Sequence, residues 1–488
     1  MSSSIYHEPG RLGVEYQVLE APSSARAELP LLLRVQVRNT GAAPWANRGA
    51  NPINMSYHWL DERGQAVDFE GVRTILPGPL RSGESVELTL TVEPPPHGGD
   101  YLLALDMVEE GIDWFSVRGI APLTLPISVA PAPPGIRRVC IVNGNCVLND
   151  AVGNHVLNQL RFFHERGYQA LVLLDHLDLR HPPELRQHMA RVTLDELRAG
   201  PDNPQTRRAV AHFQRADLYV FNYSTYYPLV EAIRLAHQGM LVFDYHGVTP
   251  PQLWDGHGAE TLEEGQRRLD LVRYADYAIA HSSFTRDELL RTGAIAPERV
   301  YQMAYVVPLD RFHPGPRPAE LVERYRLDAD QPVLLYVGRM AANKQISDLV
   351  RALPLVCERF PRAVLMLVGD DRSAAYAQVA SQARSLARDL GVAERVIFTG
   401  QVPDGELTIH YLLADLFVTA SLHEGFCIPA IEAQACGRPV VGAHATALPE
   451  TIGPGGLTFR PRDHADLARK VLELLENRCN TKQANPVD

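Results

Sequence analysis

The chain has few cysteines, and their spacing offers no pattern for joining them. None of the six lies in the first 139 of the 488 residues, and no two form a C-x-x-C pair. This spacing excludes a zinc ribbon and a disulfide framework, and it predicts reduced thiols. Long apolar runs are also missing, because none approaches the roughly 18 residues that a membrane-spanning helix needs.

Excess basic charge is absent as well. The net charge of −11 argues against a nucleic-acid binder, which would show a basic face. Residues 1–10 lack the charged-then-apolar plan of a secretory signal, so we expect a cytoplasmic location. One stretch, residues 180–215, carries seven arginines against four acidic residues. Such a stretch is typical of a solvated helix face, and weak peripheral contact with anionic lipid is the alternative.

The length predicts about three domains, and the first is a sheet domain. Short runs in which apolar and polar residues alternate fill residues 14–129, with turn signals between them. Period two predicts antiparallel strands, so we expect residues 1–130 to form a β-sandwich of immunoglobulin-like size. Trp45, Trp59 and Trp114 fall here; we interpret them as core residues, with carbohydrate binding as the alternative.

A proline-rich connector at residues 131–135 ends this pattern. Continuous apolar runs of strand length follow, separated by helical segments, and the same alternation starts again at Val333. It predicts βαβ units around buried parallel sheets. The expected fold class is therefore α/β, with two Rossmann-like doubly wound domains at residues 137–315 and 316–478, preceded by the all-β sandwich. Ligands of such sheets bind at the carboxyl ends of the strands.

Two carboxylates, Glu424 and Glu432, stand eight positions apart in the run S-L-H-E-G-F-C-I-P-A-I-E-A-Q-A-C-G. Pro429 suits the first turn of a helix, and Gly437 suits the left-handed position after the last turn. The free N–H groups and the positive dipole end of this short helix favour an anion such as a diphosphate. Glu432, one turn into the helix, is expected to accept hydrogen bonds from the hydroxyl groups of a ligand.

Two cations precede another predicted helix. Gly338 and Arg339 follow the strand that starts at Val333, and Lys344 comes five residues later. A cation at a helix N-terminus opposes the helix dipole, and such breaks of a local rule tend to mark functional sites. Arg339 and Lys344 would neutralise a departing nucleoside diphosphate without a metal.

Together these E-x7-E and G-R-x4-K patterns resemble the retaining, GT-B-fold glycosyltransferases of family 4, also called glycosyl transferases group 1. The resemblance covers about residues 137–475 and is strong after Val333. It implies that Arg339 and Lys344 contact the donor diphosphate, Glu424 the donor sugar and Glu432 the ribose. The remaining donor-binding positions are Gly338, Gly425, Phe426, Cys427 and Ile428, with Cys427 at a place where the family most often has glycine.

The resemblance also assigns residues in the first Rossmann-like domain. His246 follows a predicted strand and corresponds to the family's histidine at the sugar-facing wall; Asp244, on the same face, is expected to orient its imidazole. The expected acceptor-binding residues are Asn149, Gly153 and Asn154, although this segment departs from the family's double glycine. In residues 281–285 we favour a structural interpretation, a helix capping box made by Thr285 and Glu288.

The sequence thus predicts a retaining hexosyltransferase that uses a nucleotide-diphosphate sugar, with His246, Glu424, Arg339 and Lys344 in catalytic roles. The acceptor is unidentified, a polysaccharide or a lipid-linked molecule. We expect no cofactor and no metal, because the one D-x-D, at residues 328–330, precedes a strand and no metal-ligand spacing occurs. The alternatives are a nucleotide-sugar 2-epimerase of the same architecture and a non-enzymatic polysaccharide-binding protein.

Overall fold

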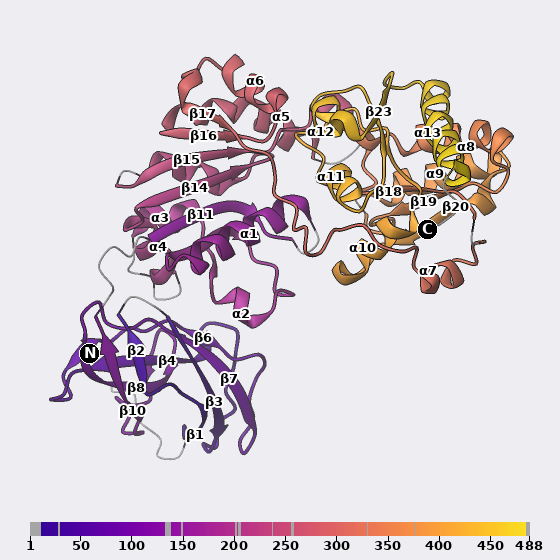
Figure 1. The fold of residues 1–488 in the computed structure, drawn as a ribbon. Coiled ribbons are helices and arrows are strands. Elements are labelled where there is room, and N and C mark those ends of the chain that lie inside the picture. Colours follow the sequence, from indigo (N-terminus) through magenta and orange to yellow (C-terminus); the bar gives the residue numbers. More distant parts are fainter. Residues whose placement is uncertain are drawn as a thin grey trace. The chain divides into compact units, whose positions relative to one another are not determined.

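The computed structural model describes residues 11–484, apart from residues 28–29, 132–137, 148–149, 201–202, 204–205, 237, 255–257, 329 and 375. Its contacts divide the chain into two units. The first comprises Met1–Ile141, Asn158–Tyr219 and Leu235–Gly239, and the second comprises Val142–Leu157, Val220–Arg234 and Met240–Asp488. Figure 1 shows their elements coloured along the sequence. Within the described ranges, no helix combines the length and the apolar character that crossing a membrane requires.

The N-terminal region consists of two β-sheets. The first has the order β1-β3-β7, made by β1 (Val14–Glu20), β3 (Leu31–Asn39) and β7 (Ser85–Val92). The second has the order β2-β10-β8-β4-β5, made by β2 (Ser24–Arg26), β10 (Leu123–Ala130), β8 (Gly99–Glu109), β4 (Ile53–Leu60) and β5 (Ala66–Asp68), with β6 (Thr74–Ile75) on β4 and β9 (Asp113–Trp114) on β8. Every second residue of β3 is buried, as the period-two pattern predicted.

One hydrophobic core joins the two sheets, so they form a sandwich. It contains Leu33 of β3 and Leu90 of β7 from the first sheet, together with Met55 of β4 and Leu105 of β8 from the second. Trp45 and Trp59 are completely buried in this core, and Trp114 is 6% exposed. The prediction that these tryptophans pack in the core is confirmed for Trp45 and Trp59, whereas Trp114 is buried outside this core, under the guanidinium of Arg73.

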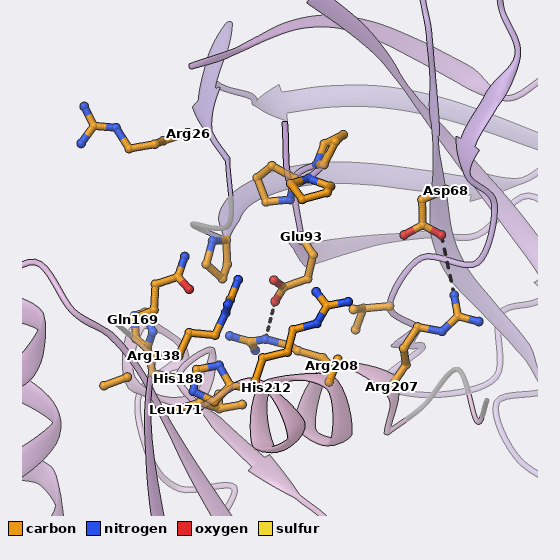
Figure 2. Close-up of a pocket in the computed structure, with 18 of the residues that line it drawn as sticks. Arg26, Asp68, Glu93, Arg138, Gln169, Leu171, His188, Arg207, Arg208 and His212 are labelled. Carbon is orange, nitrogen blue, oxygen red and sulfur yellow. Dashed lines mark ion pairs between the residues drawn. The ribbon is translucent and has the colours of Figure 1, made fainter. Parts of the chain in front are cut away.

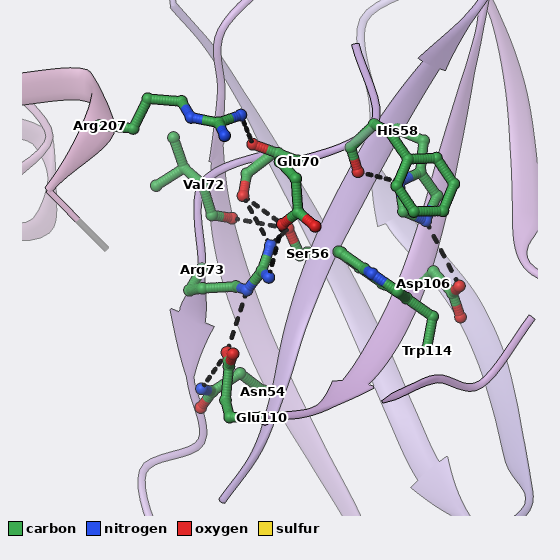
Figure 3. Close-up of polar contacts among 12 residues, drawn as sticks. Asn54, Ser56, His58, Glu70, Val72, Arg73, Asp106, Glu110, Trp114 and Arg207 are labelled. Carbon is green, nitrogen blue, oxygen red and sulfur yellow. Dashed lines mark hydrogen bonds and ion pairs between the residues drawn. The ribbon is translucent and has the colours of Figure 1, made fainter. Parts of the chain in front are cut away.

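A polar network lies on the second sheet, as Figure 3 shows. Arg73 donates to Glu110 at 3.0 Å and to Glu70 at 2.7 Å, and its guanidinium stacks over the Trp114 ring at 4.5 Å. Its side chain is almost fully buried, so these partners supply the hydrogen bonds and the charge that water would otherwise provide. The network fixes the irregular segment around Glu70 to the sandwich.

The second region is a seven-stranded sheet of order β13-β12-β11-β14-β15-β16-β17. Its strands are β11 (Arg138–Asn145), β12 (Gln169–His176), β13 (Met189–Arg191), β14 (Leu218–Tyr223), β15 (Met240–Tyr245), β16 (Tyr277–Ala280) and β17 (Val300–Gln302). Its helices are α1 (Ala151–Glu165), α2 (Pro183–Arg186), α3 (Leu194–Ala199), α4 (Arg207–Gln214), α5 (Ala259–Arg267) and α6 (Ser283–Arg291). The strand order reverses at β11, as in a doubly wound sheet.

The third region is a parallel six-stranded sheet of order β20-β19-β18-β21-β22-β23. Its strands are β18 (Val333–Val337), β19 (Val364–Val368), β20 (Val396–Gly400), β21 (Leu416–Thr419), β22 (Val440–Ala443) and β23 (Gly456–Phe459). Its helices are α7 (Ala319–Arg324), α8 (Ile346–Arg359), α9 (Ala377–Asp389), α10 (Asp404–Leu413), α11 (Ile428–Ala435), α12 (Leu448–Ile452) and α13 (His464–Ala484). Here the order reverses at β18, between β19 and β21.

Continuous apolar strands explain the burial of both faces of this sheet. All five residues of β19 are buried, and the apolar stripe of α8 packs on the same core through Ile346, Leu349, Val350, Leu353 and Val356. The predicted α/β fold class, with two doubly wound sheets after an all-β region, is confirmed.

The predicted capping box of α6 was wrong by one helical turn. Ser282, not Thr285, is the N-cap: its hydroxyl accepts from the Thr285 N–H, and the Thr285 hydroxyl accepts from the Ser282 N–H. Glu288 has another role, because it accepts a hydrogen bond from the buried Tyr245 hydroxyl at 3.0 Å. Burial raises the pKa of Glu288 to about 7.

This carboxyl makes folding stability depend on pH. The pKa of Glu288 is higher in the folded state than in the unfolded state. The protonated carboxyl therefore makes its full contribution to the free energy of unfolding below the unfolded pKa near 4.5, and this contribution is lost as the pH rises through 7. At about 1.4 kcal/mol per unit, up to ~3 kcal/mol is lost by pH 8. We therefore expect the Tm of Glu288→Gln to exceed that of the parent at pH 8 and to approach it at pH 4.5. Exposed Asp287→Asn is the control, and parallel Tm curves for Glu288→Gln and the parent would contradict this role.

Candidate functional site

The loop between β21 and α11 lies at the carboxyl end of the sheet, where the strand order reverses. The helix begins at Ile428 with Pro429 in its first turn, and Gly437 follows it with a φ of +72°, as predicted. Cys427, the N-cap, has a φ of +84°, a left-handed conformation that costs a residue with a side chain about 1–3 kcal/mol. Glycine would avoid this cost, so Cys427 leaves backbone strain at the end of the loop.

Lys344 and Glu424 meet in this structure. The Lys344 Nζ lies 2.6 Å from Glu424 Oε1, and the two side chains are 13% and 14% exposed. Lys344 ends a short 3-10 turn (Ala342–Lys344) after β18, while Glu424 is held by its N–H, which donates to Thr446 Oγ1 at 2.9 Å. The two motifs, 80 residues apart in sequence, therefore form one charged site.

Gly338 and Arg339 occupy the start of the loop after β18. The N–H of Gly338 donates to the carbonyl of Val368 at 3.0 Å, and an added Cβ at Gly369 would lie 1.9 Å from the Gly338 oxygen. Because neither Gly338 nor Gly369 has a side chain, the backbones at the ends of β18 and β19 lie in direct contact. Arg339 is exposed; desolvation by itself would lower the pKa of its guanidinium, but Asp150, Tyr376 and, to a lesser extent, Glu424 outweigh it and raise that pKa.

Gly425 is packed against the strand end that carries His246. An ideal Cβ on Gly425 would lie 1.9 Å from the His246 carbonyl oxygen, so only glycine fits. The Ser282 hydroxyl donates to the Gly425 carbonyl at 2.7 Å, and the ring of Phe426 packs edge-on against Tyr305 with centroids 5.4 Å apart. The loop therefore contacts the end of β15, the start of α6 and the segment after β17, all within the same unit.

Glu432 lies on α11, partly exposed, one turn beyond the loop. The buried hydroxyl of Tyr411 donates to its Oε2 at 2.7 Å, and the Tyr411 ring packs edge-on against Phe312. A charged acceptor strengthens this hydrogen bond and fixes the direction of the carboxylate. Ile428 lies at the start of the same helix, partly exposed.

His246 is 7% exposed, and both of its ring nitrogens have partners. Nε2 lies 3.0 Å from Asn222 Oδ1, and Nδ1 contacts the Tyr305 hydroxyl. The expectation that Asp244 orients this ring was wrong, because Asp244 accepts from His155 at 2.9 Å and from His281 at 2.8 Å. The ring of His246 instead stacks on His281, with centroids 5.0 Å apart.

The charges in this region follow from burial. Burial lowers the pKa of His246 well below its usual range, so the ring is neutral. Burial alone would raise the pKa of the Asp244 carboxyl, but the imidazoles of His246, His155 and His281 outweigh it and hold that pKa well below its usual range. Asp244 is therefore an ionised carboxylate surrounded by imidazoles.

The expected acceptor-binding residues lie at the start of α1. Asn149 lies outside the described residues. Gly153 is buried, and a Cβ there would lie 2.3 Å from the Val147 carbonyl oxygen, so its absence allows the helix to pack on the preceding loop. Asn154 is exposed, and its N–H donates to the Asp150 carbonyl at 2.8 Å. Of Gly153 and Asn154, only Asn154 is exposed.

Sequence reasoning missed five residues of this site: Asn222, Tyr305, Tyr411, His155 and His281. One signal was available for His281, since it follows β16 as His246 follows β15. Adjacent parallel strands end at the same edge, so two histidines in these positions are expected to meet. The other four come from segments whose pairing the local pattern does not specify.

The first unit has a separate cavity of about 1200 Å³, shown in Figure 2. Its walls include Arg207 and Arg208 of α4, two of the seven arginines of residues 180–215. Arg208 pairs with Glu93, and Arg207 lies 3.7 Å from Asp68 and donates to the Glu70 carbonyl. These two arginines therefore bind the sandwich, which is a structural use of the basic stretch.

Two family models match the chain. A model of glycosyltransferase family 4 matches residues 152–311, and a model of glycosyl transferases group 1 matches residues 319–486. Solved structures share the fold. A sucrose-phosphate synthase from Thermosynechococcus elongatus superposes with a TM-score of 0.56 at 22% identity over 70% of this chain and 90% of the other. Anabaena Alr3699/HepE, in complex with UDP and glucose, gives 0.59 at 19% identity over 71% and 91%. The chain thus has the GT-B fold of glycosyltransferases.

Two relatives are similar in sequence. The chain is 36% identical over 212 residues to D-inositol 3-phosphate glycosyltransferase 2 of Catenulispora acidiphila, covering 42% of this chain and 49% of the relative. It is 36% identical over 207 residues to the GDP-mannose-dependent alpha-(1-6)-phosphatidylinositol monomannoside mannosyltransferase of Mycobacterium tuberculosis, covering 40% and 52%. The chain spans about half the length of these relatives. The matches support the enzyme class predicted from the sequence.

Proposed function

We propose that this protein is a retaining glycosyltransferase that moves a hexosyl group from a nucleotide-diphosphate sugar to an acceptor. The observation that carries the proposal is the Lys344–Glu424 pair beside the loop that leads into α11. It joins a cation for the diphosphate to a carboxylate for sugar hydroxyls at the switch point of a doubly wound sheet, where nucleotides bind. Both family models and both relatives named above carry glycosyltransferase names.

The residues have distinct roles in this proposal. Lys344 and Arg339 bind the diphosphate and stabilise the negative charge that develops as the bond to the sugar breaks, together with the backbone N–H groups at the start of α11. Glu424 turns from Lys344 to the sugar hydroxyls when the donor binds, and Glu432 accepts from the ribose. The leaving phosphate accepts the proton of the acceptor hydroxyl on the same face, so the anomeric configuration is kept.

Other parts of the chain have supporting roles. We propose an immunoglobulin-like accessory domain at residues 1–130, an acceptor domain at 137–315, with His246 at the sugar-facing wall, and a donor domain at 316–478. The acceptor is a polysaccharide or a lipid-linked molecule, in keeping with the phosphatidylinositol mannoside named for one relative. No metal or cofactor takes part in the proposed transfer. The cytoplasmic location stays a prediction.

The test is a screen of nucleoside-diphosphate sugars by thermal shift, followed by assays of slow donor hydrolysis and of transfer to sugar and lipid acceptors. We expect at least one donor to raise the Tm and to be hydrolysed, and the anomeric proton coupling of the product to show retention. An epimerised nucleotide sugar formed without acceptor, or no turnover of any donor, would overturn the proposal.

The hydrogen bond from Tyr411 to Glu432 gives a prediction within this proposal. Tyr411→Phe keeps the buried ring and removes the hydroxyl, so the Glu432 carboxylate loses its orientation. A hydrogen bond to a charged group contributes about 1.5–3 kcal/mol, so we expect the KM for the donor to rise about tenfold or more while kcat changes little. Tyr325→Phe, which removes a hydroxyl bound to His410 in the same sheet region, is the matched control. Equal KM values for the two variants would contradict the role of Tyr411.

A further inference from the structure

Four side chains from three segments converge beside the loop between β21 and α11, which we call the donor loop after its proposed role. His155 of α1, Asp244 of β15, His246 after β15 and His281 after β16 each offer one ligand atom, and these atoms all lie within 4.8 Å of one another. We call these four residues the histidine cluster. Asp244, His246 and His281 are buried, whereas the side chain of His155 is 19% exposed and gives the cluster a side open to solvent.

The rings of two cluster histidines are oriented from behind. His281 Nδ1 lies 2.8 Å from the Met303 carbonyl oxygen, which directs Nε2 to Asp244 Oδ1 at 2.8 Å. His246 Nε2 lies 3.0 Å from Asn222 Oδ1, and Nδ1, on the opposite side of the ring, contacts the Tyr305 hydroxyl, which an ion bound there has to displace. Metal-binding histidines are held in this way, with one nitrogen on a carbonyl or amide oxygen and the other toward the ion.

We propose that the histidine cluster binds one Zn²⁺ ion. Three imidazole nitrogens and one carboxylate oxygen make a donor set that zinc prefers, and four ligands complete a tetrahedron. Zinc–ligand distances near 2.0–2.1 Å separate tetrahedral ligand atoms by about 3.3 Å, so ligand atoms that now lie within 4.8 Å of one another need to approach by about 1.5 Å or less.

The position of the cluster indicates a structural role for this ion. The ring of Tyr305 stacks on His281 with centroids 3.8 Å apart and contacts Phe426 of the donor loop on its edge. An ion that fixes His281 and His246 therefore also fixes the surface on which Phe426 packs. The proposal shares His246 with the sugar-facing wall of the proposed function, but no metal takes a step in the proposed transfer, and metal binding is measured independently of transfer.

The test measures metal binding directly. The full chain without an added histidine tag is stripped with a chelator, dialysed, and titrated with ZnCl₂ or CoCl₂. We expect one ion per chain by elemental analysis, visible absorption bands typical of tetrahedral Co²⁺, and a Tm raised by Zn²⁺ and lowered again by EDTA. If the protein holds no ion above background at a small excess of metal, the proposal is overturned.

Two variants keep the hydrogen bonds and remove a metal ligand. His281→Asn retains a donor for the Met303 carbonyl but lacks Nε2, and His155→Gln retains a donor for Asp244 but lacks a nitrogen lone pair. We expect each to bind Zn²⁺ and Co²⁺ at least tenfold more weakly, whereas His410→Asn, a buried histidine bonded to Glu406 and Tyr325, binds like the parent. Equal affinity in the parent and both cluster variants would place the metal elsewhere.

Discussion

Lys344→Met is expected to lower kcat/KM for sugar transfer about 100- to 1000-fold. The substitution keeps the length of the side chain and removes the cation that binds the diphosphate in the proposed mechanism. It also leaves Glu424, which is 14% exposed, without the ammonium that lies 2.6 Å away. Truncating one partner of a buried charge pair costs about 2–5 kcal/mol, and each 1.36 kcal/mol on the barrier is about tenfold in rate.

Stability and catalysis can be separated with a second substitution. In Lys344→Met/Glu424→Gln the unpaired carboxylate is gone, so we expect the Tm to recover toward that of the parent while transfer stays low. Lys470→Met is the matched control, because Lys470 pairs with Glu473 at 3.3 Å on α13, away from the donor loop. Transfer by Lys344→Met within tenfold of the parent would remove Lys344 from the donor site.

Gly425→Ala is expected to lower both the Tm, by about 5 °C or more, and the rate of transfer, by about 100-fold. The added Cβ would lie 1.9 Å from the His246 carbonyl oxygen and 2.8 Å from its carbon, so backbone must move on one side. Overpacking of this kind costs about 1–3 kcal/mol or more. A shift of the loop also displaces Phe426 and Glu424, and a misplacement near 1 Å can cost about 100-fold in rate.

Gly405→Ala is the matched control for this prediction. Gly405 is exposed in α10, and a Cβ there meets open space. Alanine in a helix is favoured over glycine by about 0.5–1 kcal/mol, so we expect the Tm to stay equal or to rise slightly. A Gly425→Ala variant that melts and turns over like Gly405→Ala would show that the loop does not pack on His246.

The local pattern was sufficient for the elements that carry the proposed donor site. The N-terminal proline and C-terminal glycine of α11, the apolar stripe of α8 and the position of Lys344 before it are short-range features, and the structure has each of them. Strand ends could also be placed, because continuous apolar runs predict buried parallel strands. The pairing of Lys344 with Glu424 could not be predicted from the local pattern, because it depends on the strand order that places β21 beside β18.

The sequence by itself determined the order of the elements, the fold class and the two motifs, because these depend on periodicity and on residues within one turn of each other. Only the tertiary structure decided which side chains meet: Asn222 rather than Asp244 at His246, Ser282 rather than Thr285 at the cap of α6, and Tyr411 at Glu432. Such contacts join residues that are distant in the chain, or residues that compete for one partner. Burial and packing decide which of the possible partners meet, and the pattern of residues along the chain contains no information on either.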